Sequence, residues 1–221
     1  MKRRKKAYNS YYNRVIKRLL DVLISGTAVI ILSPVYLIIA VMIALEDGFP
    51  VLYRADRGGY MGKPFRIAKF RSMVKNADKI GGGTTALHDS RITKTGEFLR
   101  KTKLDELPQL LQVLKGDMSL IGPRPELLKY VEQYEGAEKD ILKVRPGITD
   151  YSSVEFINLD EIVGAGNADE MYEKYVLKKK NKLRIKYAHT VSFRTDAYIL
   201  FKTLSAVIDK ATGFVFRNEH R

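Results

Sequence analysis

Two adjacent acidic residues, Asp105 and Glu106, stand in the sequence RKTKLDELP, directly after a group of cations. One interpretation is an ordinary helix start, because aspartate is a favourable N-cap and proline suits the first turn. The nearby cations Arg100, Lys101 and Lys103 favour a second interpretation. They would keep Asp105 ionised, and a helix N-terminus also favours an anionic ligand such as phosphate. Neighbouring side chains on a helix diverge by about 100°, so we expect the two acids to have different roles.

Further cations end a predicted strand or stand beside prolines: Lys69, Arg71, Arg124 between Pro123 and Pro125, and Arg145 before Pro146-Gly147. An arginine next to prolines loses little conformational freedom on binding, and its guanidinium can bind a phosphate with two parallel hydrogen bonds. Each of these short patterns is a weak indication alone. Together with the acidic pair they indicate a site for a phosphorylated substrate.

A long apolar stretch precedes these residues. Val22 to Leu45 contains 24 consecutive residues without a charge. As a helix it would extend roughly 36 Å, enough to cross a hydrocarbon core of about 30 Å. Pro34, near its middle, cannot donate to the carbonyl of Ile30 and should kink or break the helix. The hydroxyl of Ser33 can bond the freed carbonyl, which makes such a break tolerable in lipid.

Both flanks of the apolar stretch are basic. Eight lysines and arginines precede it, and six more stand between positions 54 and 71. Basic flanks belong on the cytoplasmic side of a membrane. A re-entrant topology satisfies both flanks, because each half reaches about mid-depth and the chain returns to the side from which it came. A kinked helix that spans the membrane with its N-terminus inside is the alternative. The stretch is too long for the apolar region of a cleaved signal peptide.

Composition limits the remaining possibilities. The 221 residues carry a formal net charge of +14, with no cysteine and three scattered histidines. Disulfides and thiolate metal sites are excluded, and the histidines lack the spacing of metal ligands. A basic domain attached to a membrane suits anionic headgroups, phosphorylated substrates or nucleic acid. Cations, an acidic pair and a membrane attachment together suggest a diphosphate substrate, a divalent metal and a lipid acceptor.

The remaining pattern predicts a mainly α fold with a small β-hairpin (α+β). The expected division is a membrane part at 1–47, with the break at Ser33-Pro34, and a compact cytosolic catalytic domain at 48–221. Strand-like runs at 51–54 and 65–70 enclose glycines and a proline, which indicates a hairpin. Helices are expected at 95–101, 107–114, 126–134, 138–144, 168–187 and 191–210, and residues 150–167 are expected to be irregular. The last helix is amphipathic, and its apolar face suits either the core or a bilayer surface.

Three segments resemble the bacterial sugar transferase family, the monotopic phosphoglycosyl transferases that begin glycan assembly on polyprenol phosphate. They are KFRSM at 69–73, DSRITKTGEFLRKTKLDELPQLLQVLKGDMSLIGPRP at 89–125 and RPGIT at 145–149. Ser33-Pro34 in the apolar stretch adds to the resemblance. The resemblance covers nearly the whole chain, and the block at 104–125 is highly specific to the family. The chain looks like the minimal catalytic form, which lacks the additional N-terminal spanning helices of long members.

The resemblance implies a reaction and roles for individual residues. Asp105 would attack the β-phosphate of a UDP-sugar, release UMP and carry the phosphosugar, with Glu106 in support. Mg²⁺, with Asp105 as a ligand, would neutralise the diphosphate, and polyprenol (undecaprenyl) phosphate would then accept the phosphosugar. The family positions that line the site are Lys69, Arg100, Arg124 and Arg145. The resemblance also implies a re-entrant helix and a bacterial inner membrane, with the catalytic domain on the cytoplasmic face.

Two departures from the family pattern leave the sugar open. Lys103 stands where members often have serine, and residues 150–167 differ from the GLAQV-type continuation of many relatives. The expected partners are a UDP-sugar, polyprenol phosphate and membrane lipids, without nucleic acid. Two alternatives remain: a membrane-spanning protein whose basic domain binds nucleic acid or other anions, and a glycosyltransferase that releases UDP. The leaving nucleotide, UMP or UDP, separates the two enzymes.

Overall fold

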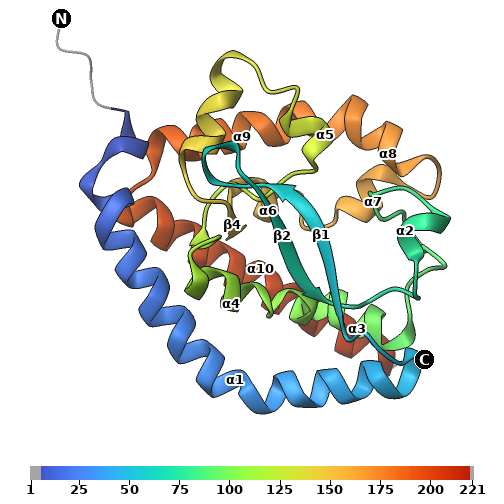
Figure 1. The fold of residues 1–221 in the computed structure, drawn as a ribbon. Helices are drawn as coiled ribbons and strands as arrows, with labels where there is room; N and C mark the ends of the chain where they lie inside the picture. The colour runs from blue at the N-terminus through green and yellow to red at the C-terminus, as the bar shows by residue number, and fades with distance from the viewer. Residues whose placement is uncertain (1–5, 220–221) are drawn as a thin grey trace, which may run out of the picture.

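The computed structural model describes residues 6–219, with their side chains except those of residue 78 and residues 210–219. The described chain is mostly helical and includes two small two-stranded sheets (Figure 1). A short 3-10 turn, η1 (Ala7–Asn9), and a π-helical turn, η2 (Tyr12–Ile16), lead into the long helix α1 (Lys17–Asp47). The mainly α prediction with one small hairpin is confirmed.

Helix α1 is continuous but bent. It is helical from Lys17 to Asp47 with Pro34 inside it, and it changes direction near its middle (Figure 1). The expected break is therefore a bend, since no residue leaves the helix. Ser33 Oγ donates to the Ile30 carbonyl at 2.8 Å, which satisfies the acceptor that Pro34 cannot reach. This hydrogen bond confirms the one expected from the sequence. Together with η2, α1 forms a helical segment at Tyr12–Asp47. Among the described residues it is the one helix that is long and apolar enough to cross a membrane.

The predicted hairpin is present. Strands β1 (Leu52–Gly58) and β2 (Pro64–Phe70) pair antiparallel around the turn η3 (Tyr60–Gly62). The buried Gln112 lies along the other edge of β2: its Oε1 accepts from Ala68 N at 2.8 Å and its Nε2 donates to the Arg66 carbonyl at 2.7 Å. The amide therefore fixes β2, and Lys69 within it, against the helix that carries Gln112.

The acidic pair lies between two helices. After the short helix α2 (Ala77–Ile80), helix α3 (Lys94–Thr102) ends at Lys103, which has a left-handed backbone with φ of 60°. The 3-10 turn η4 (Leu104–Glu106) follows, and helix α4 (Gln109–Lys115) begins only after Pro108. Asp105 therefore does not cap an α-helix, and the helix-start interpretation is wrong. The reversal at Lys103 turns this tight segment towards β2.

A second sheet was not predicted. Strands β3 (Ser119–Ile121) and β4 (Gly147–Thr149) form a parallel pair of three residues each. The two chains cross so closely that a Cβ on Gly147 would lie 2.0 Å from Gly122 N, a separation that only glycine permits. This crossing places the PRP segment, which follows β3, beside β4.

The second half of the chain is helical. Residues 150–167, expected to be irregular, contain two short helices, and the Asp150 side chain caps the first by accepting from Ser153 N at 2.8 Å. The elements after β3, apart from β4, are α5 (Leu128–Val131), η5 (Gly136–Lys143), α6 (Tyr151–Glu155), α7 (Leu159–Val163), α8 (Ala168–Met171), η6 (Tyr172–Val176), α9 (Leu177–Thr190) and α10 (Phe193–Glu219).

Both ends of α1 are attached to the remainder of the molecule. At its start, Lys17 Nζ lies 2.6 Å from Asp196 Oδ2 on α10, and both side chains are buried. Near its end, Ile39 and Ile43 belong to a buried cluster with Phe70 and Leu99. The two-part division at residue 47 stays a prediction, and these contacts show that the two parts pack together.

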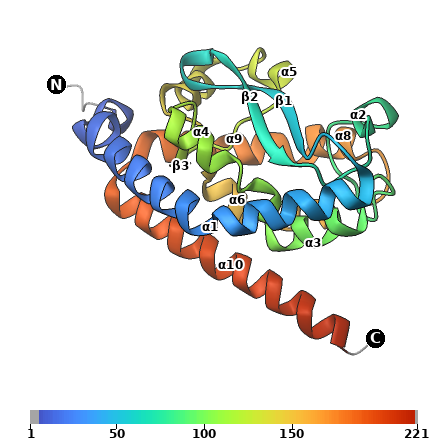
Figure 2. The same cartoon turned by 60° about the horizontal axis from the view of Figure 1, so that its bottom comes forward.

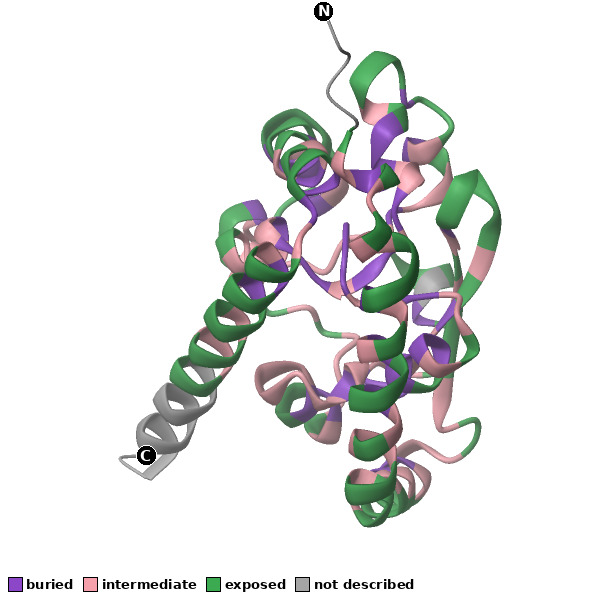
Figure 3. Cartoon of the chain, turned by 90° about the vertical axis from the view of Figure 1, so that its left-hand side faces the viewer, coloured by how far each residue is buried: buried purple, intermediate pink, exposed green. Residues whose placement is uncertain are grey.

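Large apolar side chains are exposed on both long helices. On α1 they include Ile30, Ile31 and Leu45, which are 76%, 68% and 83% exposed. On α10, Phe193, Phe201, Leu204 and Ile208 are exposed, so the predicted apolar face of the last helix is not core. Figure 3 shows this exposure along the described part of α10, and Figure 2 shows its C-terminal end extending away from the other elements.

Candidate active site

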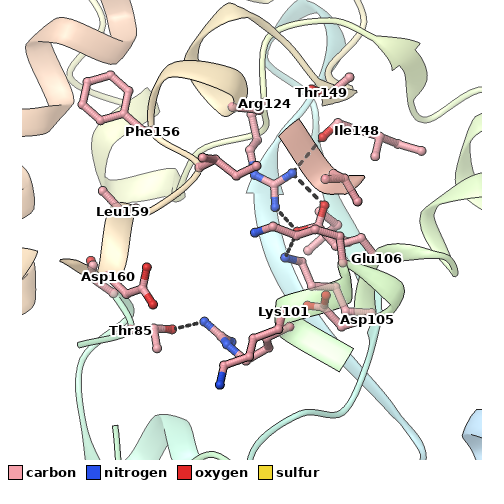
Figure 4. Close-up of a pocket in the computed structure, with 18 of the residues that line it drawn as sticks. Thr85, Lys101, Asp105, Glu106, Arg124, Ile148, Thr149, Phe156, Leu159 and Asp160 are labelled. Carbon is pink, nitrogen blue, oxygen red and sulfur yellow. Dashed lines mark hydrogen bonds and ion pairs between the residues drawn. The ribbon is translucent and has the colours of Figure 1, made fainter. Parts of the chain in front are cut away.

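A cavity of about 1080 Å³ opens beside the acidic pair. Its walls come from the hairpin, the loop at 83–89, α3, η4, the segment after β3, residues 148–161, α9 and α10. Six of the residues predicted for the site line it: Lys69, Arg100, Asp105, Glu106, Arg124 and Pro125. Figure 4 shows Asp105, Glu106 and Arg124 close together, with Phe156 and Asp160 on the other side of the cavity.

Glu106 is the anionic centre of the site. Arg124 Nη1 lies 2.8 Å from Glu106 Oε2, and Arg124 Nη2 bonds Glu106 Oε1. Lys69 Nζ lies 3.0 Å from the same Oε1, and the Glu106 side chain is only 12% exposed. Burial opposes the charge, but Arg124 and then Lys69 outweigh it and keep the pKa of Glu106 well below its usual range. Glu106 is therefore ionised and fixes both cations.

Arg124 is fixed from two sides. Its Nη1 also donates to the Ile148 carbonyl of β4 at 2.8 Å, and its backbone N–H donates to Asp150 Oδ2 at 3.2 Å. Both contacts depend on the parallel β3–β4 pair, which brings residues 148–150 beside the PRP segment. Burial lowers the pKa of Arg124, and Glu106 more than reverses this, so the net shift is upward.

Asp105 has a different environment. It is 5% exposed, and among the described residues no hydrogen-bond partner contacts its buried Oδ1. Burial first, and then the charge of Glu106, raise the pKa of Asp105, while Lys69, Arg100 and Lys103 reduce that rise. The upstream cations Arg100 and Lys103 favour the ionised form of Asp105, as expected from the sequence, but burial and Glu106 oppose them and the net shift of its pKa is upward. Asp105 therefore combines a buried carboxylate oxygen without a described partner with a position in the wall of a cavity that cations also line.

The three upstream cations have separate environments. Arg100 Nη2 donates to Thr85 Oγ1 at 2.7 Å (Figure 4) and lines the cavity. Lys101 Nζ lies 2.6 Å from Glu97, one turn back on α3, in a partly exposed ion pair. Lys103 also lines the cavity, and burial lowers its pKa. Within the part of the chain that the structure describes, neither Arg100 nor Lys103 forms an ion pair with Asp105.

Three predicted residues are not brought to the cavity. The Arg71 guanidinium donates to the carbonyls of residues 47, 48 and 50 and pairs with Asp47 Oδ2 at 3.0 Å, so it attaches the end of α1 to the hairpin. Arg145 donates to the Gly116 carbonyl at 3.2 Å and lies over the Tyr60 ring. Pro123 lies outside the cavity wall, although Pro125 is part of it. Their predicted role in substrate binding has no support in these positions.

Comparison with known proteins adds to this geometry. The profile described as bacterial sugar transferase matches residues 12–210. The chain belongs to the bacterial sugar transferase family. A UDP-glucose:undecaprenyl-phosphate glucose-1-phosphate transferase of Klebsiella pneumoniae is 38% identical to it over 87% of this chain and 40% of that protein. A UDP-N-acetylgalactosamine-undecaprenyl-phosphate N-acetylgalactosaminephosphotransferase of Aeromonas hydrophila is 37% identical over 90% of this chain and 44% of that protein.

Relatives of similar length also exist in the family. The exopolysaccharide production protein ExoY of Sinorhizobium fredii is 34% identical over 87% of this chain and 85% of its own length. By contrast, this chain spans less than half the length of the Klebsiella and Aeromonas transferases that it matches. The family's profile includes the bent helix, the acidic pair and all of the cavity walls up to residue 210.

The cavity of this sugar transferase family member also contains a charged cluster that the sequence did not indicate. Glu126 Oε2 accepts from Arg184 Nη1 at 3.0 Å and from the Tyr172 hydroxyl, and all three side chains are buried. Lys180, on the same helix as Arg184, completes this wall. Arg184 and Lys180 stand in a segment of nine residues with six cations, so only burial distinguishes them from solvated neighbours.

The fit of a divalent metal can be judged from the carboxylates. In the described part of the chain no three histidine, aspartate or glutamate residues form a metal-binding group. Mg²⁺ commonly binds one or two protein carboxylates together with substrate phosphates. The unpartnered Oδ1 of Asp105 suits such a shared site, whereas both oxygens of Glu106 already bond cations.

Proposed function

We propose that this chain transfers a phosphosugar from a UDP-sugar to polyprenol (undecaprenyl) phosphate, giving polyprenyl-diphosphate-sugar and UMP. The observation that carries the proposal is the arrangement around Asp105: an unpartnered, buried carboxylate oxygen in a cavity lined by Lys69, Arg100 and Arg124. The reactions named for the Klebsiella and Aeromonas relatives have this form.

The proposed first step is covalent. An ionised oxygen of Asp105 attacks the β-phosphorus of the UDP-sugar, and the bond from this phosphorus to the bridging oxygen breaks. UMP leaves with that oxygen and its electron pair, and a phosphosugar remains on Asp105. In the second step an oxygen of the polyprenol phosphate attacks the same phosphorus and releases the Asp105 carboxylate. A covalent intermediate divides one difficult displacement into two easier ones.

The other residues act through charge and position. Glu106 orients Arg124 and Lys69, and the two cations stabilise negative charge on the phosphoryl oxygens during transfer. Arg124 suits this role because Glu106 and the Ile148 carbonyl hold its planar guanidinium and Asp150 holds its backbone N–H, so the group is pre-organised. Arg100 is placed to bind the same phosphate from the α3 side of the cavity.

Mg²⁺ is part of the proposal, with Asp105 and the donor diphosphate as its ligands. When bound, it would supply positive charge that neutralises the diphosphate. The residues described above would carry out binding and orientation. Removing Mg²⁺ with a chelator should therefore abolish transfer.

We also propose that α1 is re-entrant in the bacterial inner membrane, with the domain after residue 47 on the cytoplasmic face. The bend near Pro34, the exposed apolar side chains of α1 and the basic flanks support this topology. Single cysteines at Ser10 and Gly59 test it, because the chain has none of its own. Both should resist a thiol reagent confined to the periplasm. Labelling of one cysteine alone would establish a spanning helix instead.

The released nucleotide tests the reaction class. Detergent-solubilised protein is incubated with a panel of UDP-sugars, Mg²⁺ and undecaprenyl phosphate, and UMP and UDP are both measured. Release of UMP that continues over many turnovers only when the lipid is present supports phosphosugar transfer. Release of UDP would establish a glycosyltransferase. Release of neither, together with salt-dependent binding of nucleic acid, would establish a basic binding domain.

A further inference from the structure

The wall opposite Asp105 contains a cation without a counter-ion. Lys180 of α9 lines the cavity and is only 7% exposed. No hydrogen-bond or ion-pair partner of Lys180 occurs among the residues that the structure describes. Its Nζ lies over two rings, 5.1 Å from the centroid of Tyr172 and 5.7 Å from that of Phe156. The nearby Glu126 is already bonded by Arg184 and Tyr172.

Burying a lysine costs free energy unless an anion compensates its charge. Contacts with two aromatic faces compensate only in part. A buried lysine that lines a cavity, with the neighbouring Glu126 already bonded by two other residues, therefore indicates an anionic ligand that enters the cavity.

The direction of the proposed reaction indicates which anion it is. In phosphoryl transfer the attacking and leaving oxygens lie roughly in line on opposite sides of phosphorus. If Asp105 attacks, the leaving nucleotide must therefore lie across the cavity from it. Figure 4 shows Phe156 on that opposite side, and Lys180 Nζ lies against the Phe156 ring. We infer that Lys180 binds the phosphate of the departing nucleoside monophosphate. This inference rests on the proposed function.

The charges around Lys180 agree with this assignment. Burial, and then the positive charge of Arg184, lower the pKa of Lys180 to about 7. Arg124 lowers the pKa of Lys180 further, whereas Glu126 and Asp150 raise it. Arg124, the cation bonded to Glu106, is therefore close enough to Lys180 to act on its charge. A phosphate dianion would raise this pKa, so Lys180 should acquire a proton when nucleotide binds above neutral pH.

The test measures UMP binding by titration calorimetry with the full-length, detergent-solubilised chain at about pH 8, in two buffers of different ionisation enthalpy. Wild-type protein should acquire close to one proton per UMP. Lys180→Met should weaken UMP binding about tenfold or more and abolish proton uptake. Lys180→Arg should bind UMP without proton uptake, because arginine stays charged. Lys179→Met, an exposed neighbour on the same helix, is the matched control and should behave as wild type.

Three results would overturn the inference. The first is that Lys180→Met binds UMP as tightly as the wild type, and the second is that the wild type acquires no proton on binding UMP. The third is that Lys180→Met loses as much affinity for glucose 1-phosphate as for UMP, which would place Lys180 on the sugar side of the cavity. Detection of the phosphosugar adduct at Asp105 distinguishes failure of this inference from failure of the proposed function. If that function is wrong, wild-type protein forms no adduct at Asp105. If only the inference is wrong, the adduct forms and Lys180→Met binds UMP normally.

Discussion

Replacing Glu106 by glutamine removes one negative charge from the centre of the site and keeps the side-chain shape. Glu106 is 12% exposed and bonds Arg124 through both oxygens and Lys69 at 3.0 Å. Breaking a buried pair by removing one partner costs about 3–5 kcal/mol, because the remaining charge is buried without compensation. For a chain of this length that corresponds to a decrease in Tm of roughly 6–20 °C.

The matched control is Glu97→Gln. Glu97 also pairs with a lysine, Lys101 at 2.6 Å, but its side chain is 58% exposed. Exposed helical pairs of this spacing contribute about 0.3–0.5 kcal/mol, so Tm should decrease by only about 1–2 °C. Thermal unfolding followed by the helical circular dichroism signal measures both variants. Adding Lys69→Met to Glu106→Gln should recover part of the loss, since it removes one uncompensated cation.

Equal decreases in Tm for Glu106→Gln and Glu97→Gln would refute this reasoning. They would mean that Glu106 is not needed to compensate the charges of Arg124 and Lys69.

Three further predictions concern individual residues. The nucleophile reacts only when ionised, and the pKa of Asp105 is raised. The single-turnover rate of UMP release should therefore rise with pH through that pKa and level off above it. A rate already constant from about pH 5 would show that Asp105 has the pKa of an ordinary carboxyl group. Arg71→Met should lower Tm with little change in KM, because each buried acceptor left without a hydrogen bond costs about 1–3 kcal/mol of stability. An unchanged Tm with a raised KM would show instead that Arg71 binds substrate. Arg124→Lys should turn over faster than Arg124→Ala but well below wild type, since a lysine cannot replace two parallel hydrogen bonds; full activity in the Lys variant would exclude a bidentate phosphate contact.

Parts of the fold were predictable because they depend on local sequence. Glycines and a proline between two strand-like runs identified the hairpin at 52–70. The bond from Ser33 to Ile30 followed from the covalent structure of Pro34. Asp105 and Glu106 were identified by neighbouring charges and by the specific block at 104–125, and both line the cavity.

The remaining features depend on contacts between distant segments. Strands β3 and β4 are three residues long, too short for a detectable period, and 25 residues of chain separate them. Their pairing decides that Arg124 enters the cavity, whereas the similar Arg145 does not. Arg71 resembles Lys69 in sequence, and two residues apart they would share one face of a continuous strand. However, β2 ends at Phe70, and Arg71 contacts the end of α1 instead. Lys180 is one of three consecutive lysines and differs from Lys179 only in burial.

The central claim is that Asp105 carries a covalent phosphosugar. Wild-type protein mixed with UDP-sugar and Mg²⁺, without lipid acceptor, should release a burst of about one UMP per active site and increase in mass by one phosphosugar, located at Asp105 by peptide mapping. Asp105→Asn should fold but show neither burst nor adduct, whereas Glu106→Gln should be slower and still form the adduct. Normal turnover by Asp105→Asn, or an adduct located at Glu106, would contradict the proposed mechanism.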